Sequence, residues 1–165
     1  MALVRSHTPA VVVRQLRQAL GRIHTNTERP EETLRERAEA VLGAVREIPA
    51  AVLIANDRGH YIDVNAAATK LTGYSRTELL RLSVWDLTPR PRRDLGQRLW
   101  QEFLARGRMS GEYQIRRKDG QLMKARYVAV ANVLPGVHVS ALVPAGDRHT
   151  STSRAVQRVG NARIK

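Results

Sequence analysis

The sequence has no cysteine, and this absence excludes several kinds of chemistry. Disulfides, thiolate metal sites, cysteine nucleophiles and chromophores attached through a thiol are all ruled out. Aromatic residues are also scarce, with two Trp, four Tyr and one Phe among 165 residues, so the core must be mainly aliphatic. No apolar run approaches the roughly 20 residues that a membrane-spanning helix needs. We therefore expect a soluble, cytoplasmic protein with no membrane contact.

The charge is strongly positive, with a formal net charge of +13 at pH 7. The excess is spread along the chain instead of being held in one segment. Such basicity favours weak, salt-sensitive contact with nucleic acid or with acidic partners. It is also typical of a solvated surface that merely prevents aggregation, which is the interpretation that we favour.

The first 49 residues indicate two helical segments ahead of the main domain. Residues 1–30 form a basic segment that we expect to be partly helical or disordered, with an amphipathic stretch over Val11–Ile23. Residues 31–49 predict a cap or dimerisation helix that starts after Pro30 and ends before Pro49. Apolar residues recur on one face of that helix, at Leu34, Ala38, Val41, Leu42 and Val45.

Short β-runs separated by turn residues follow at both ends of the central region. The expected strands cover Ala51–Ala55, His60–Val64, Ser110–Arg117, Leu122–Val133 and Val137–Val143. The pair Asp119-Gly120 is a strong signal for a hairpin between two of them. A Ser/Thr/Arg-rich stretch at 147–165 has little apolar surface to bury, which predicts a disordered basic tail.

Helix signals occupy the region between the second and third of these strands. Asn65 precedes three alanines and should cap a short helix that closes at Gly73. Ser75 and Glu78 have the spacing of a capping box at the start of another. A further short turn is expected near Leu87, and a longer helix over Arg92–Ala105.

Together these elements predict an α+β domain over residues 50–146. The order is two strands, several short helices with one longer helix, and three strands. It favours a five-stranded antiparallel sheet with these helices packed on one face, plus the N-terminal helix.

This order resembles that of the PAS domain family, over about Val45–Val143. Six segments occur in the family's sequence order and spacing: Asp57-Arg58-Gly59, Val64-Asn65-Ala66-Ala67, Leu71-Thr72-Gly73-Tyr74-Ser75, Glu78-Leu79-Leu80, Val84-Trp85-Asp86-Leu87 and Arg117-Lys118-Asp119-Gly120. The resemblance implies a module that binds a small ligand, a cofactor or another protein between the sheet and its long helix. It also implies that a signal passes through the flanking helices. The chain departs from the family at Val143-Pro144, where many members have Asp-Ile-Thr and an output helix.

The family's cofactors can be compared with the residues present. Members that form a flavin adduct or anchor a chromophore need a cysteine, so those photochemistries are excluded. Haem-binding members commonly place a histidine on the long helix, which has none here, and haem binding is not expected. His60 and His138 lie on predicted strands, and we interpret them as surface or edge residues. The cofactor, if there is one, is unknown.

A candidate pocket follows from strand alternation. Lys124 and Arg126 should face water, which turns Ala125 and Ala129 toward the helices, where small side chains leave room. The expected lining, for a small apolar or aromatic ligand, is Trp85, Leu95, Leu99, Phe103 and Tyr127. The alternative is a filled aliphatic core, and from the sequence alone we favour that interpretation.

No constellation of residues in the sequence indicates catalysis. The acidic residues Asp57, Asp63, Asp86 and Asp119 lie in turns or beside caps, and none is expected to pair with a histidine or a second acid in a way that suggests general acid and base roles. We therefore expect a non-enzymatic sensor or interaction module in bacterial-type signal transduction or transcription regulation. It would act as a homodimer, through the helix at 31–49 and an outer sheet face bearing Val128 and Val130, or through a separate partner protein. The alternatives are a nucleic-acid-associated regulator that uses the basic tail, and a sensor with a bound cofactor or small ligand.

Overall fold

The computed structural model describes residues 9–23, 33–89 and 93–146. Five antiparallel strands form one sheet in the order β2-β1-β5-β4-β3. The strands are β1 (Ala51–Ala55), β2 (Tyr61–Val64), β3 (Arg108–Arg116), β4 (Leu122–Leu134) and β5 (Val137–Pro144). The five-stranded α+β architecture predicted from the sequence is thus confirmed.

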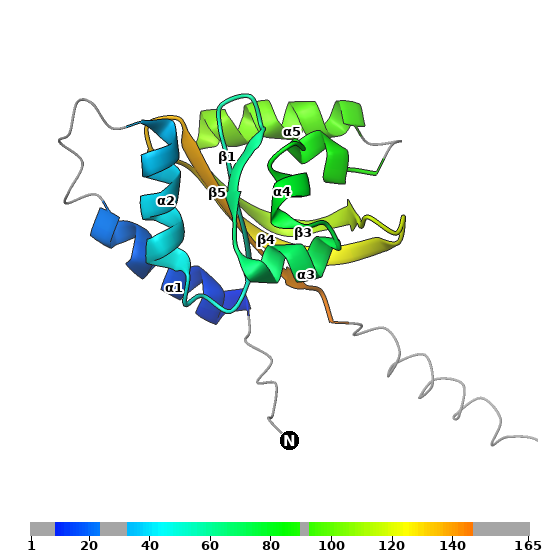
Figure 1. Cartoon of the computed structure of the whole chain (residues 1–165), viewed down its shortest axis with the longest axis horizontal. Coiled ribbons are helices and arrows are strands. Elements are labelled where there is room, and N and C mark those ends of the chain that lie inside the picture. Colours follow the sequence, from blue (N-terminus) through cyan, green and yellow to red (C-terminus); the bar gives the residue numbers. More distant parts are fainter. Residues whose placement is uncertain (1–8, 24–32, 90–92, 147–165) are drawn as a thin grey trace, which may run out of the picture.

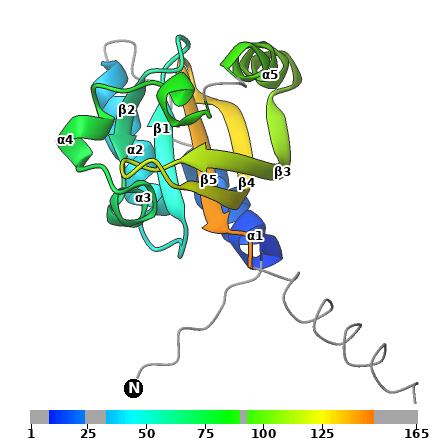
Figure 2. The same ribbon diagram turned by 90° about the vertical axis from the view of Figure 1, so that its right-hand side faces the viewer.

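Helices cover both faces of this sheet, as Figures 1 and 2 show. On one side, here called the outer face, lie α1 (Pro9–Ile23) and α2 (Leu34–Val45). On the other side, the inner face, lie α3 (Ala66–Thr72), α4 (Arg76–Leu79), the 3₁₀ helix η2 (Val84–Leu87) and the long α5 (Arg93–Arg106). Because β1 lies between two other strands and is covered on both sides, all five of its residues are buried.

The outer layer is an aliphatic core built from alternate strand residues and both N-terminal helices. Val52 and Ile54 of β1 point into it, whereas their neighbours Leu53 and Ala55 point to the inner side. The helices supply Leu16 of α1, with 1% of its surface exposed, among the residues that bury this face. The expected helix at Val11–Ile23 therefore exists and belongs to the folded core.

The start of α2 lies slightly later than the sequence suggested. Thr33 caps the helix, its hydroxyl accepting from the Glu36 N–H while the Glu36 carboxylate accepts from the Thr33 N–H. These hydrogen bonds lower the pKa of the Glu36 carboxyl group. The capping box fixes where α2 begins, and residues 31 and 32 lie outside the described part of the chain.

The outer sheet face is covered by the chain's own helices, which removes one premise of the predicted dimer. Val128 and Val130 are only half-exposed and pack against the aliphatic core beneath α1 and α2. Leu42 packs against the same core. Most of the apolar stripe of α2 is thus covered within one chain, although Leu34 at its start is 37% exposed. The homodimer stays a prediction.

Asn65 connects β1, β2 and α3, and its predicted capping role is confirmed. Its Oδ1 accepts from the N–H of Ala68 at 3.0 Å and from that of Val52 at 2.9 Å. Its Nδ2 donates to the Ala50 carbonyl at 2.9 Å. Asn65 therefore joins the first inner helix, α3, to β1, which is more than a cap alone does.

The inner helices end and begin where the sequence indicated. Gly73 closes α3 with a left-handed backbone, φ 79°, which glycine adopts without strain. Ser75 and Glu78 form the predicted capping box of α4. The five strands also agree with their predicted ranges to within two residues. The predicted tail at 147–165 lies outside the described residues.

No helix in the described ranges is both long and apolar enough to cross a membrane.

Candidate functional site

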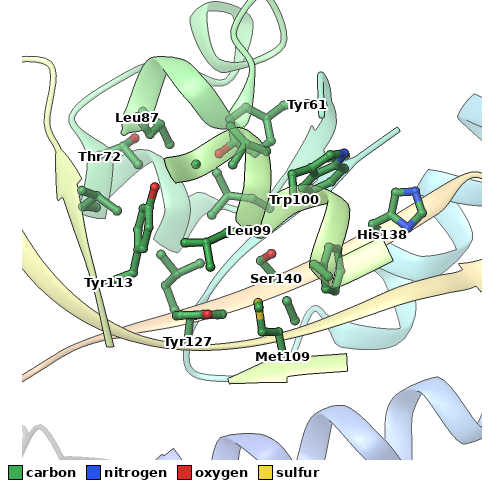
Figure 3. Close-up of a pocket in the computed structure, with 18 residues that line it drawn as sticks. Tyr61, Thr72, Leu87, Leu99, Trp100, Met109, Tyr113, Tyr127, His138 and Ser140 are labelled. Atoms are coloured by element: carbon green, nitrogen blue, oxygen red, sulfur yellow. The ribbon is translucent and has the colours of Figure 1, made fainter. Parts of the chain in front are cut away.

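A cavity of about 110 Å³ lies on the inner face, between the sheet and α5. Figure 3 shows its lining side chains converging from the strands below and the helices above. The lining residues are Leu53, Ala55, Tyr61, Thr72, Val84, Leu87, Gly96, Leu99, Trp100, Phe103, Met109, Tyr113, Ile115, Tyr127, Ala129, His138, Ser140 and Leu142. None of these residues bears a permanent charge, so the site suits an uncharged guest.

Small residues leave this space open between large ones. Ala129 of β4 and Ser140 of β5 are neighbours in the sheet, and both face the cavity. Gly96 faces it from α5, where an added Cβ would lie 3.5 Å from the Thr88 side chain. Aromatic rings such as Trp100 and Phe103, 5.3 Å apart, are too stiff to collapse into the gap.

A group of hydroxyls lies at one end of the cavity. Tyr113 and Thr88 share a hydrogen bond at 2.8 Å, and the Thr72 hydroxyl donates to the Ala68 carbonyl at 2.8 Å. Tyr61 also lies in the cavity wall, with 8% of its surface exposed. Burial raises the pKa of the Tyr61 phenol, and the nearby Tyr113 and Asp86 raise it further. The phenol therefore stays protonated and can donate a hydrogen bond.

His138 occupies the other end of the cavity wall and is buried, with 2% of its surface exposed. Its Nδ1 accepts from the Asn132 N–H at 3.0 Å, so its proton lies on Nε2, which donates to Asp57 Oδ1 at 2.8 Å. The rings of Trp100 and Phe103 meet it edge-on at 5.6 and 6.0 Å. The interpretation of His138 as a surface or edge residue was therefore wrong, whereas His60 is exposed as expected.

The burial of His138 has a local cause that the sequence pattern concealed. β4 and β5 lose their regular pairing between Val130 and Leu134, and Asn132 adopts a positive φ of 50°. This irregularity turns the Asn132 N–H toward the imidazole. Trp100 also donates from Nε1 to the Asp57 carbonyl at 3.1 Å, which closes the same corner.

Three of the five residues predicted to line the pocket do so: Leu99, Phe103 and Tyr127. Burial raises the pKa of Tyr127, which stays protonated at neutral pH. Whether these three contact a ligand stays a prediction.

Leu95 and Trp85 are outside the lining, and their assignment to the pocket was wrong. Leu95 is 47% exposed. Residues four apart on a helix differ in direction by roughly 40°, so Leu95, Leu99 and Phe103 do not all point the same way. The face of α5 that lines the cavity contains Gly96, Leu99 and Phe103. Trp85 packs edge-on against Trp100 at 5.9 Å and lies over Gly59, so it supports the wall from behind.

Several lining residues were missed by the sequence reasoning. His138, Ser140 and Leu142 alternate along β5, and Tyr61 lies across β1 from that strand. His138, Ser140 and Leu142 are alternate residues of one strand, which indicates that their side chains share one face of the sheet. The alternation did not say which face, because β5 carries apolar residues on both sides.

Haem and flavin do not suit the cavity as it stands. Its volume of about 110 Å³ is well below the roughly 300–1,000 Å³ of pockets for drug-sized ligands. Both nitrogens of His138 are engaged, so it is not available as an iron ligand. Within the described residues no group of three or more His, Asp or Glu side chains could hold a metal ion.

Solved structures share this fold at low sequence identity. A PAS domain from Colwellia psychrerythraea is 20% identical with a TM-score of 0.56, covering 71% of this chain and 100% of that chain. A domain of a sensory box sensor histidine kinase/response regulator from Geobacter sulfurreducens is 23% identical with a TM-score of 0.53, covering 67% and 96%. The PAS domain of a LuxR-family transcriptional regulator from Burkholderia thailandensis, solved in complex with ethanol, is 19% identical with a TM-score of 0.52, covering 62% and 94%.

No curated protein matches the chain. A profile described as "PAS domain" matches residues 49–140, which is more than half of the 165 residues. That range includes β1 to β4, the first half of β5, the inner helices and nearly all of the cavity lining. The chain therefore belongs to the PAS domain family.

Proposed function

We propose that this protein is a non-enzymatic sensor module of signal transduction, in which a small ligand in the inner-face cavity sets the state of the outer helices. The observation that carries the proposal is the apolar cavity beneath α5, which a purely structural core would have filled. Solved neighbours that belong to a sensor histidine kinase and a transcriptional regulator support a signalling context.

A physical route from the cavity to the outer helices runs through β5. Ser140 faces the cavity, while the adjacent Val139 and Ala141 pack into the aliphatic core under α1 and α2. A ligand that displaces this strand must also shift the residues that support the helices, because interiors are close-packed. The outer helices are thus positioned to report on cavity occupancy.

The recipient of this signal would be a second copy of the chain or a separate partner protein. The exposed side of α2, which includes Glu39 and Ala40, is available for such a contact. Light scattering at high micromolar concentration separates the two: a dimeric mass supports self-association, and a monomeric mass leaves a separate partner as the recipient.

The proposal can be tested by filling the cavity. Small uncharged organic compounds should raise the melting temperature of the wild type, since a ligand that binds only the folded state stabilises it. Ala129→Leu places extra carbon atoms in the cavity from a side chain that is 5% exposed, and it should abolish that rise. Ala105→Leu, on the exposed side of α5, is the matched control and should respond as the wild type does. Equal responses in all three proteins would contradict the proposal.

A further inference from the structure

A second hollow, here called the α2 cleft, lies where α2 begins and two turns of the sheet meet. Its volume is about 460 Å³, within the roughly 300–1,000 Å³ of small-molecule sites. The start of α2, the β1–β2 turn and the β4–β5 turn supply its lining, which consists of Leu34, Arg37, Asn56, Asp57, Arg58, Pro135 and Gly136. None of these residues lines the inner cavity, so the α2 cleft is a different place on the molecule.

Two guanidinium groups give the α2 cleft its chemical character. Arg37 is half-buried, and its Nη1 donates to the Pro135 carbonyl at 3.0 Å, whereas Arg58 is exposed. Neither arginine forms an ion pair with an acidic group in the described part of the chain. The one carboxylate of the lining, that of Asp57, accepts from His138 Nε2 at 2.8 Å. Because a planar guanidinium can bind a carboxylate through two parallel hydrogen bonds, the cleft favours an anion of that kind.

An apolar wall lies beside these charges. Leu34, the first residue of α2, lines the cleft with 37% of its surface exposed. Gly136 faces it with a left-handed backbone, φ 74°, and a Cβ there would lie 3.5 Å from Leu34 Cδ1 and 3.7 Å from Asp57 Oδ2. A side chain at this position would therefore occupy the cleft, which glycine leaves open. An apolar group attached to the bound carboxylate would cover Leu34 and remove its surface from water.

Asp57 connects the α2 cleft with the inner cavity. Its side chain, 72% exposed, lines the cleft, while its Oδ1 accepts from His138, whose ring lies in the cavity wall. Its carbonyl accepts from Nε1 of Trp100, which lies beside His138 in that wall (Figure 3). Arg58 is the next residue of the same turn, where the Asn56 side chain accepts from the Arg58 N–H at 3.0 Å. A ligand bound to Arg58 therefore acts on the turn that holds two residues of the cavity wall.

We infer that the α2 cleft binds a small organic carboxylate and that Asp57 transmits this binding to His138. The anionic group of the ligand is held by Arg37 and Arg58, and its apolar part lies against Leu34. This inference goes beyond the proposed function, because it assigns a second ligand to a different site. The module then has two inputs, an uncharged guest in the inner cavity and an anion in the α2 cleft, which meet at His138.

The test of the site uses sodium benzoate as the probe, with chemical-shift titration of the full chain at neutral pH. The methyl signals of Leu34 should shift more than those of Leu99 in the inner cavity, where a buried anion would lack a counter-charge. Arg58→Gln should weaken binding about tenfold, since it removes a charged hydrogen-bond donor. Arg46→Gln makes the same change of charge at the exposed residue that follows α2, and this control should bind as the wild type does.

Asp57→Ala tests the link to the inner cavity separately. In the wild type, benzoate should also shift the ring nitrogen signals of His138, whereas in Asp57→Ala it should still bind but leave those signals unchanged. No response of His138 in the wild type would overturn the link. An unshifted Leu34, or equal affinities in Arg58→Gln and the wild type, would overturn the site. These failures differ from a failure of the proposed function, which concerns uncharged guests of the inner cavity.

Discussion

The two faces of one sheet are built differently, although the same strands supply both. The outer face is filled by aliphatic residues of α1, α2 and the strands, including Leu16 and Val41 at 1% and 0% exposure. The inner face combines aromatic rings with alanine, glycine and serine, and retains a cavity. Well-packed branched side chains give rigidity, whereas rings beside small residues leave space that a ligand can use. We therefore expect the outer face to contribute most of the stability, and the proposed binding to occur at the inner face.

The largest expected effect comes from placing a charge in the outer layer. Val41 of α2 is fully buried, so Val41→Asp would bury an unpaired carboxylate and should abolish cooperative folding. Ala40→Asp, on the exposed neighbouring position of the same helix, is the control. Circular dichroism during heating distinguishes them. A Val41→Asp protein that melts like the control would show that α2 is not part of the core.

A smaller effect is expected from shortening one buried side chain of α1, which tests whether this helix belongs to the outer layer. Leu16→Ala should lower the free energy of unfolding by about 2–5 kcal/mol, because it deletes a buried side chain and leaves a cavity. Leu95→Ala makes the same chemical change at a residue with 47% exposure and should cost no more than about 0.5 kcal/mol. Urea denaturation measures both. Similar values for the two variants would mean that α1 does not pack on the sheet.

Asn65→Ala tests the junction between β1 and the inner helices. Loss of the cap alone costs about 1 kcal/mol, and the two further side-chain hydrogen bonds to Val52 and Ala50 bring the expected loss to about 2 kcal/mol. Urea denaturation again gives the value. Ser75→Ala is the control, because it removes the exposed N-cap of α4 and should lower the free energy of unfolding by about 1 kcal/mol. A loss at Asn65 no larger than at Ser75 would reduce its role to that of an ordinary cap.

Local signals made most of the fold predictable from the sequence. Asn65, Gly73 and the Ser75–Glu78 pair act through backbone groups close to them in the chain, so their roles could be deduced without tertiary information. The alternation along β4 likewise placed Ala125 and Ala129 on the inner face, where they are found.

The cavity was less predictable because it depends on contacts between distant segments. His138 is buried by Asn132, Asp57 and Trp100, and no periodicity along β5 reveals that neighbourhood. Leu95 was misplaced because the helical phase of α5 against the sheet decides which of two adjacent residues faces inward. Local residue types determine where the helices and strands lie in the sequence. The packing of these elements against one another determines which residues line the cavity.

The contrast between a solid outer face and a hollow inner face can be tested most directly with xenon. Xenon binds apolar cavities, so diffraction from crystals held under xenon pressure shows where such space exists. We predict a xenon site on the inner face beside Leu99, Phe103 and Ala129, and none around Leu16 and Val41. An inner cavity that takes up no xenon, or xenon within the outer layer, would contradict the account.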